Sequence, residues 1–180
     1  MFETLVAALA RLRVALGWVF GVLVIVLANP TARTISVGMS IALAGELVRI
    51  WAAGHLNKAR EVTSSGPYRY VGHPLYLGSS IMGLGLAIAC RSVLVAALIA
   101  LYLATTITAA IKSEEAFLRR HFGAQYDLYR SGVEERRRFS AAQAIANHEH
   151  RAAIGLVVAV LLLVLKATYN GMFWRATAGH

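Results

Sequence analysis

The chain has 180 residues, of which 58% are hydrophobic and only 15% are charged, and its mean hydropathy is +0.59. A soluble domain is usually about half apolar and a quarter charged, so this composition excludes an ordinary soluble protein and indicates that the bilayer is the solvent. The formal net charge of +9 would indicate nucleic-acid binding in a soluble protein, but basic loops on one side of a membrane explain it more simply, and we expect no nucleic-acid partner.

Five apolar segments are candidates for membrane-crossing helices: residues 14–28, 34–53, 75–90, 92–111 and 152–169. About 20 residues cross a bilayer, so the second and fourth segments suffice alone and the others need flanking residues. The first has arginines before it, like a signal peptide, but the apolar stretch 5–10 ahead of them is unlike such a leader. We therefore expect an all-α integral membrane bundle of about five transmembrane helices, forming a single domain over residues 1–180.

Lysines and arginines set the expected orientation of these helices. With the N-terminus in the cytoplasm, most basic loop residues fall inside, and only a few fall on the far side: Arg33, Arg91, Lys166 and Arg175. The C-terminus then lies on the far side. The basic segment 133–151, within the C-terminal part 131–180, is expected to lie along the anionic inner leaflet before the last helix.

Several polar or small residues have plain structural explanations. Glu46 and Arg49 lie three residues apart within the second segment and are expected to form a structural pair. The histidines of His148-Glu149-His150 do not share a helical face, so a solvated surface is expected there and no metal site. Cys90, the only cysteine, allows neither an intramolecular disulfide nor a thiolate cluster.

Two polar clusters, both expected in loops, carry the functional signal: residues 65–78 and residues 112–129. Only Arg91 separates the third and fourth segments, so the two helices should form a tight antiparallel hairpin. The start of the third helix at His73-Pro74 then faces the end of the fourth at Glu114-Glu115. The topology alone predicts a composite site at one membrane depth.

The residue types in this site match a ligand with several charged groups. Pro74 suits a first helical turn, where free amides favour an anion such as a carboxylate. The two glutamates supply negative charge for an ammonium or a ribose hydroxyl, and aromatic faces for a purine or a cation come from Tyr68, Tyr70 and Tyr76. Each motif alone is also typical of a turn, an aromatic belt or a solvated charge pair.

The run 65–78, Glu114-Glu115 and the Phe-Gly-x-x-Tyr-x-x-Tyr stretch from Phe122 resemble the isoprenylcysteine carboxyl methyltransferase family, which is similar to the phospholipid methyltransferases. The resemblance covers about residues 45–130. It implies S-adenosylmethionine in a cytoplasmic pocket and a lipophilic acceptor entering from the membrane. By this resemblance the cofactor contacts are Val62, Thr63, Tyr68, His73, Pro74, Leu75, Tyr76 and Glu115. Glu114 takes the acceptor side and is the first candidate for a catalytic base, with His73 the second.

Two positions depart from the family pattern. The family usually has arginine before His-Pro, where Gly72 stands here, so an arginine contact is either missing or supplied by Arg69 from one helical turn earlier. Enzymes that methylate prenylated cysteine carry an arginine near the end of the fourth helix, where Ala110 stands here, which weakens the expectation of a prenylcysteine acceptor. The acceptor nucleophile (carboxylate, amine or thiol) and the oligomeric state stay open. The alternatives are a membrane reductase of the sterol-reductase type using NADPH, and a non-enzymatic membrane scaffold.

Overall fold

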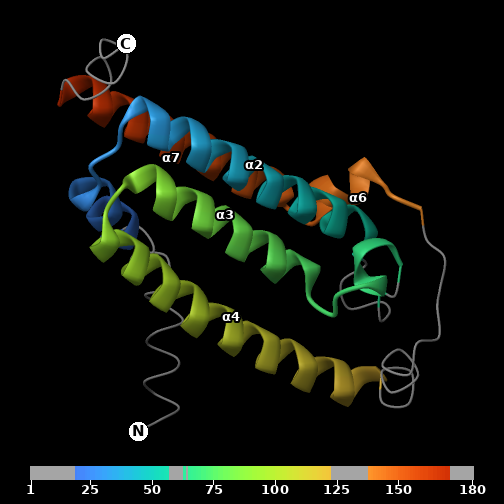
Figure 1. Ribbon diagram of the computed structural model, residues 1–180. Coiled ribbons are helices and arrows are strands. Elements are labelled where there is room, and N and C mark those ends of the chain that lie inside the picture. The colour runs from blue at the N-terminus through green and yellow to red at the C-terminus, as the bar shows by residue number, and fades with distance from the viewer. Residues whose placement is uncertain (1–18, 57–62, 64, 123–137, 171–180) are drawn as a thin grey trace, which may run out of the picture.

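The computed structural model describes residues 19–56, 63, 65–122 and 138–170, and this part of the chain contains helices and no strand. Residues 19–27 are helical. The remaining elements are α2 (Ala32–His55), the 3-10 turn η1 (Gly66–Arg69), α3 (Pro74–Cys90), α4 (Val93–Phe122), the short α6 (Ala141–Ala146) and α7 (Glu149–Tyr169) (Figure 1). The predicted all-α membrane bundle is confirmed.

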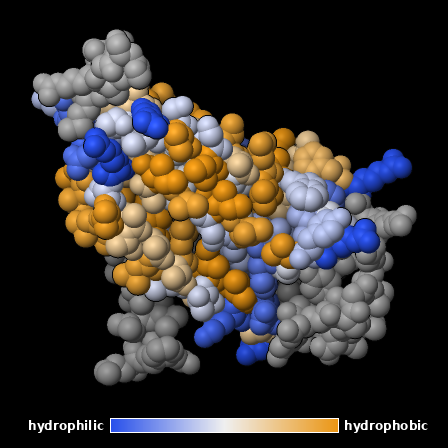
Figure 2. All heavy atoms as spheres, viewed as in Figure 1, coloured by the Kyte–Doolittle hydropathy of each residue, from blue (hydrophilic) through white to orange (hydrophobic). Residues whose placement is uncertain are grey.

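Three helices are long and apolar enough to cross a membrane: Ala32–His55, Val93–Ala116 and Glu149–Tyr169. The apolar helix Pro74–Cys90 is shorter. Most residues of the three long helices face outward, and apolar side chains cover the middle of the surface in Figure 2 while hydrophilic residues gather toward its ends. So much exposed apolar surface is rare on a soluble monomer and suits lipid. The first predicted segment, 14–28, is described only from residue 19.

Local signals fix where the helices begin and end. Thr31 caps α2 through a capping box with Thr34, and Pro74 occupies the first turn of α3 as expected. Arg91 ends α3 in the left-handed conformation, with φ of 47°. Arg91 and Ser92 together form the turn to α4, one residue more than predicted. The short turn makes α3 and α4 the expected antiparallel hairpin.

The end of α4 corrects the sequence prediction. The apolar segment was expected to end at residue 111 and a loop to follow, but the helix continues to Phe122. The residues that follow the apolar stretch, Lys112–Ala116, include lysine, glutamate and alanine, which are strong helix formers. The helix therefore continues beyond its apolar stretch. Glu114 and Glu115 are therefore held on a helix and not on a loop.

Glycines let α2 and α3 pack with their backbones close together. A Cβ at Gly45 would lie 2.6 Å from the carbonyl oxygen of Gly78, and one at Gly38 would collide with the backbone of Gly85. Close approach at small residues is a common way for membrane helices to associate. α3 therefore packs mainly against α2 and much less against α4, which diverges from it toward the α4 C-terminus (Figure 1).

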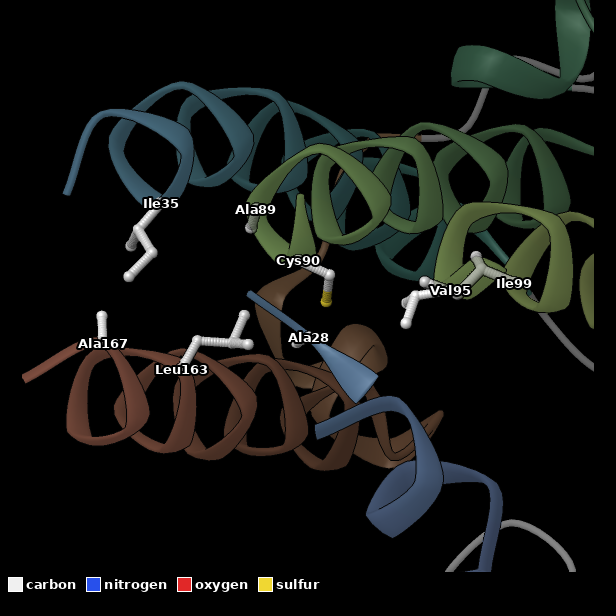
Figure 3. Close-up of a cluster of buried hydrophobic side chains, with 8 residues drawn as sticks. All are labelled: Ala28, Ile35, Ala89, Cys90, Val95, Ile99, Leu163 and Ala167. Atoms are coloured by element: carbon white, nitrogen blue, oxygen red, sulfur yellow. The ribbon is translucent and has the colours of Figure 1, made fainter. Parts of the chain in front are cut away.

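A core of buried apolar side chains lies near the α3–α4 turn and joins α2, α3, α4 and α7 (Figure 3). It consists of Ala28, Ile35, Ala89, Cys90, Val95, Ile99, Leu163 and Ala167. Cys90 is one of its small buried members, which accounts for it without any chemistry. This core fixes the hairpin at one end, and His73, Glu114 and Glu115 lie toward the other end.

Candidate functional site

The end of α2, the start of α3, the end of α4 and the start of α7 all lie toward the end of the bundle opposite the α3–α4 turn (Figure 1). η1 and α6 lie at the same end. The two polar clusters that are separated in the sequence therefore share one end of the molecule. The hairpin topology is the physical reason for this arrangement.

His73 lies between the two glutamates of α4. Its Nδ1 is 3.7 Å from Oε2 of Glu114, and its Nε2 is 3.7 Å from Oε1 of Glu115. Successive helical residues point about 100° apart, which lets neighbouring glutamates flank one ring. The imidazole is free for this position because His73, although it is the N-cap of α3, makes no capping hydrogen bond with its side chain.

Tyr76 completes the cluster from the first turn of α3. Its hydroxyl donates a hydrogen bond of 3.1 Å to Oε2 of Glu114, and its ring lies 5.7 Å from the ring of His73. A charge-assisted hydrogen bond of this kind orients the carboxylate that accepts it. The expected meeting of His73 with Glu114 and Glu115 is thus confirmed, and Tyr76 joins them.

The charge of this cluster decides what it can hold. Two carboxylates face one imidazole, and both carboxylate side chains keep 37% of their surface exposed. A site with this excess of negative charge attracts a cation such as a sulfonium or an ammonium. It offers little attraction to an anionic group at the same point.

Two other predicted cofactor residues, Tyr68 and Leu75, lie against the C-terminal end of α2. Tyr68 is buried with Ala52 and Leu56, and Leu75 packs against the same group. Thr63 and Pro74 are also buried. Val62 and the stretch 123–129 lie outside the described residues. The structure therefore brings together His73, Tyr76, Glu114 and Glu115, and places Tyr68 with Leu75 in a neighbouring apolar group.

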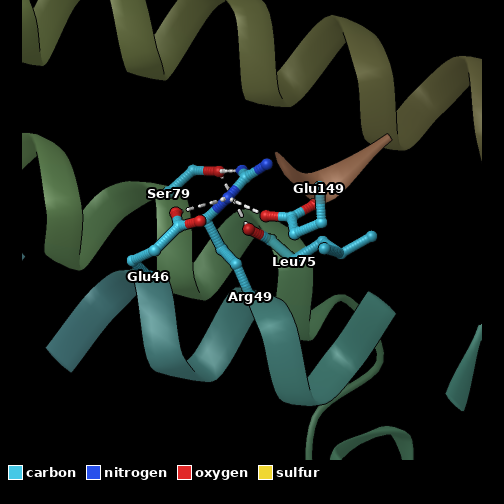
Figure 4. Close-up of polar contacts among 5 residues, drawn as sticks. All are labelled: Glu46, Arg49, Leu75, Ser79 and Glu149. Carbon is cyan, nitrogen blue, oxygen red and sulfur yellow. Dashed lines mark hydrogen bonds and ion pairs between the residues drawn. The ribbon is translucent and has the colours of Figure 1, made fainter. Parts of the chain in front are cut away.

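A second polar cluster lies between α2, α3 and α7 (Figure 4). The Arg49 guanidinium lies 2.7 Å from Oε1 of Glu149 and 3.5 Å from Oε2 of Glu46, and it donates a short hydrogen bond to Oγ of Ser79. Ser79 in turn donates to the carbonyl oxygen of Leu75 at 2.9 Å. Both oxygens of Glu46, whose side chain is 3% exposed, accept no hydrogen bond from the described part of the chain.

This cluster corrects the expected exposure of Glu149 and adds partners to the expected pair of Glu46 and Arg49. Glu149 was predicted to lie on a solvated surface, but it is only 6% exposed because it pairs with Arg49 from another helix. His148 and His150 are exposed as predicted. The pairing of Glu46 with Arg49 is confirmed, but its partners Ser79 and Glu149 were missed because they are distant in the sequence. No group of three potential metal ligands occurs among the described residues.

One protein family and two individual proteins are detectably similar to this chain. The profile of the phospholipid methyltransferase family matches residues 19–125. The nickel-cobalt-cadmium resistance protein NccN of Alcaligenes xylosoxydans xylosoxydans is 33% identical over 101 residues, which are 55% of this chain and 47% of that protein. The cobalt-zinc-cadmium resistance protein CzcN of Cupriavidus metallidurans is 36% identical over 87 residues, which are 47% of this chain and 39% of that protein.

The matched part of this chain thus spans less than half the length of each of these two relatives. No solved structure is detectably similar to it. The family match covers more than half of the chain and contains α2, α3, α4 and the whole cluster around His73. The chain belongs to the phospholipid methyltransferase family, a family of integral membrane methyltransferases.

Proposed function

We propose that this protein transfers a methyl group from S-adenosylmethionine to a lipophilic acceptor at the cytoplasmic face of the membrane. The observation that carries the proposal is the convergence of His73, Tyr76, Glu114 and Glu115 at one end of an apolar hairpin. These side chains lie within the part of the chain that matches the methyltransferase family. The basic loops expected at the same end support the cytoplasmic assignment.

In the proposed reaction the protein does not need to activate the methyl donor. A sulfonium is already a good leaving group, so the site must hold the methyl carbon and the acceptor atom in line. Such positioning is worth roughly 7–11 kcal/mol of the barrier. The negative charge of Glu114 and Glu115 suits the cationic donor, and loss of the methyl group leaves a neutral thioether that the same charges hold less strongly.

We assign the residues of the cluster to two sides. Glu115, His73 and Tyr76 contact the cofactor, together with Pro74 and Leu75 of the first turn of α3 and with Val62, Thr63 and Tyr68 of the segment before it. Glu114 faces the acceptor and takes its proton where the acceptor is an ammonium, with His73 as the second candidate base. The hydrogen bond from Tyr76 holds Glu114 for this role.

The negative charges of Glu114 and Glu115 also favour some classes of methyl acceptor over others. A carboxylate acceptor would have to approach two carboxylates, and Ala110 offers no charge where related prenylcysteine enzymes have arginine. Arg49 does not replace that arginine, because it is already paired with Glu46 and Glu149. An amine or a neutral thiol on an apolar molecule fits the site better than a carboxylic acid.

Ligand-dependent heat stabilisation tests the proposed cofactor. The purified protein in detergent is titrated with S-adenosylmethionine, S-adenosylhomocysteine and NADPH while its melting temperature is followed. A ligand at 100 times its Kd stabilises a protein by about 2.7 kcal/mol, so both adenosyl compounds should raise the melting temperature by several degrees. Stabilisation by NADPH alone would overturn the proposal, and so would the absence of any response to the two adenosyl compounds.

A further inference from the structure

The segment from Phe139 to Glu149 holds the C-terminal end of α2. The side-chain amide of Asn147 donates hydrogen bonds of 2.8 Å to the carbonyl oxygens of both Ala53 and Leu56. The backbone N–H of Ser140 donates to the carbonyl oxygen of Gly54 at 3.1 Å. Carbonyl groups in the last turn of a helix have no partner within the helix, so these three bonds fix an end that would otherwise fray.

From this end of α2 a chain of contacts reaches the segment that leads to His73. The ring of Phe139 lies directly over Gly54, where a Cβ would collide with it, and 5.9 Å from the ring of His55. His55 is 5% exposed, and its Nδ1 donates to the carbonyl oxygen of Trp51 at 2.9 Å. On its other side the His55 ring faces Gly66, where a Cβ would lie 2.6 Å from the ring.

Gly66 is the point at which the segment toward His73 rests on α2. Its φ of +61° is a conformation that side chains other than glycine rarely adopt, and it begins η1. The close ring and the backbone conformation both require glycine here. A change in the position of His55 would therefore move the start of the short segment that runs through Tyr68 to His73.

A second connection reaches α3 itself. Glu149 pairs with Arg49, which binds Ser79, and Ser79 donates to the carbonyl oxygen of Leu75. Leu75 and Ser79 flank Tyr76 on the same helix. Because a helix moves as a rigid element, the position of Ser79 also sets the position of Tyr76 and of the preceding His73.

We propose that the segment from Phe139 to Glu149 is a positioning element for the cofactor site, acting through His55 on one side and through Arg49 on the other. The segment lies beyond residues 19–125, which match the family. The contacts described above join this segment to the end of α2 and to Arg49, and through them it acts on the position of the site. The inference rests on the proposed function, because it concerns the same site.

Substitution of Phe139 tests this element with matched controls. Phe139→Ala removes the ring beside Gly54 and His55, while Phe139→Tyr keeps it, and the half-exposed position leaves room for the added hydroxyl. His150→Ala changes an exposed neighbour of Glu149. The dissociation constant for S-adenosylhomocysteine is measured by calorimetry in detergent, at a temperature where circular dichroism shows every variant folded.

Phe139→Ala should raise the dissociation constant about tenfold, and Phe139→Tyr and His150→Ala should leave it within about twofold of the wild-type value. Glu149→Gln weakens the connection through Arg49 and should raise the dissociation constant by a similar factor. This variant replaces Phe139→Ala in the test if Phe139→Ala does not fold. A purely structural role would lower melting temperatures and leave the constant unchanged at low temperature, which would overturn the inference alone. Failure of the wild-type protein to bind S-adenosylhomocysteine would overturn the proposed function, and this inference with it.

Discussion

At the scale of single residues, the hydrogen bond between Tyr76 and Glu114 is the contact most open to a clean test. The phenol is the group that fixes one of the two carboxylates around His73. A hydrogen bond to a charged group contributes about 1.5–3 kcal/mol. Without it, Glu114 keeps its charge but loses its fixed orientation.

Tyr76→Phe should therefore reduce the rate of methyl transfer by roughly tenfold or more, a loss consistent with that energy, at a temperature where circular dichroism shows the variant folded. Tyr102→Phe is the matched control, because Tyr102 stacks on Phe20 away from the site. The rate is measured as label transferred from S-adenosylmethionine to extracted lipid. Equal losses in the two variants would contradict a specific role for the Tyr76 hydroxyl.

Contacts between distant residues were predictable from the sequence only where the hairpin topology determined them. The tight turn at Arg91 was enough to predict that His73 would meet Glu114 and Glu115. It could not show that Glu149 is buried, because its partner Arg49 lies 100 residues away in the sequence. The two bonds from Asn147 to the end of α2 are equally non-local and leave no periodic signal.

At the scale of helices, glycine packing between α2 and α3 determines where the site lies. α3 carries His73 and Tyr76, and its distance from α2 is set by Gly38, Gly45, Gly78 and Gly85. Hydrophobicity alone predicted these helices but ended α4 at residue 111, because the apolar stretch stops there while helix-forming residues continue. Helix propensity past the last apolar residue was the signal that would have placed Glu114 and Glu115 on the helix.

Gly45→Leu should force the two helices apart and lower the stability by about 3 kcal/mol or more, because overpacking at a backbone contact leaves no room for relaxation. Gly155→Leu is the control, since a Cβ at Gly155 on α7 meets nothing within 4 Å. Surface changes of that kind usually stay within about 0.5 kcal/mol. Thermal unfolding in detergent compares the two variants, and similar melting temperatures would show that α2 and α3 are not held by this contact.

At the scale of the whole molecule, an apolar bundle carries a polar cluster at one end. The apolar core of Figure 3 closes the hairpin near the α3–α4 turn, and the cluster of His73, Tyr76, Glu114 and Glu115 lies at the other end. The C-terminal helix α7 joins this arrangement at both its ends. Glu149 pairs with Arg49, and Nζ of Lys166 donates to the carbonyl oxygens of Ile25 and Val26 at 2.7 and 2.6 Å.

Such a molecule is suited to join a water-soluble donor to an acceptor dissolved in the membrane. In the reaction we propose, the donor reaches the polar end from solution, and the acceptor reaches the same point along apolar helix surfaces. The orientation expected from the basic loops puts this meeting point on the cytoplasmic side.

The most direct measurement is transfer of a labelled methyl group from S-adenosylmethionine to the lipid extract of inside-out membrane vesicles that contain the protein. The wild-type protein should label an extractable product, and Glu114→Gln should reduce the rate by about 10²-fold or more, as expected for a residue that handles a proton. Equal labelling by the two proteins, or no labelling above vesicles without the protein, would contradict a methyl-transfer site at the end of this hairpin.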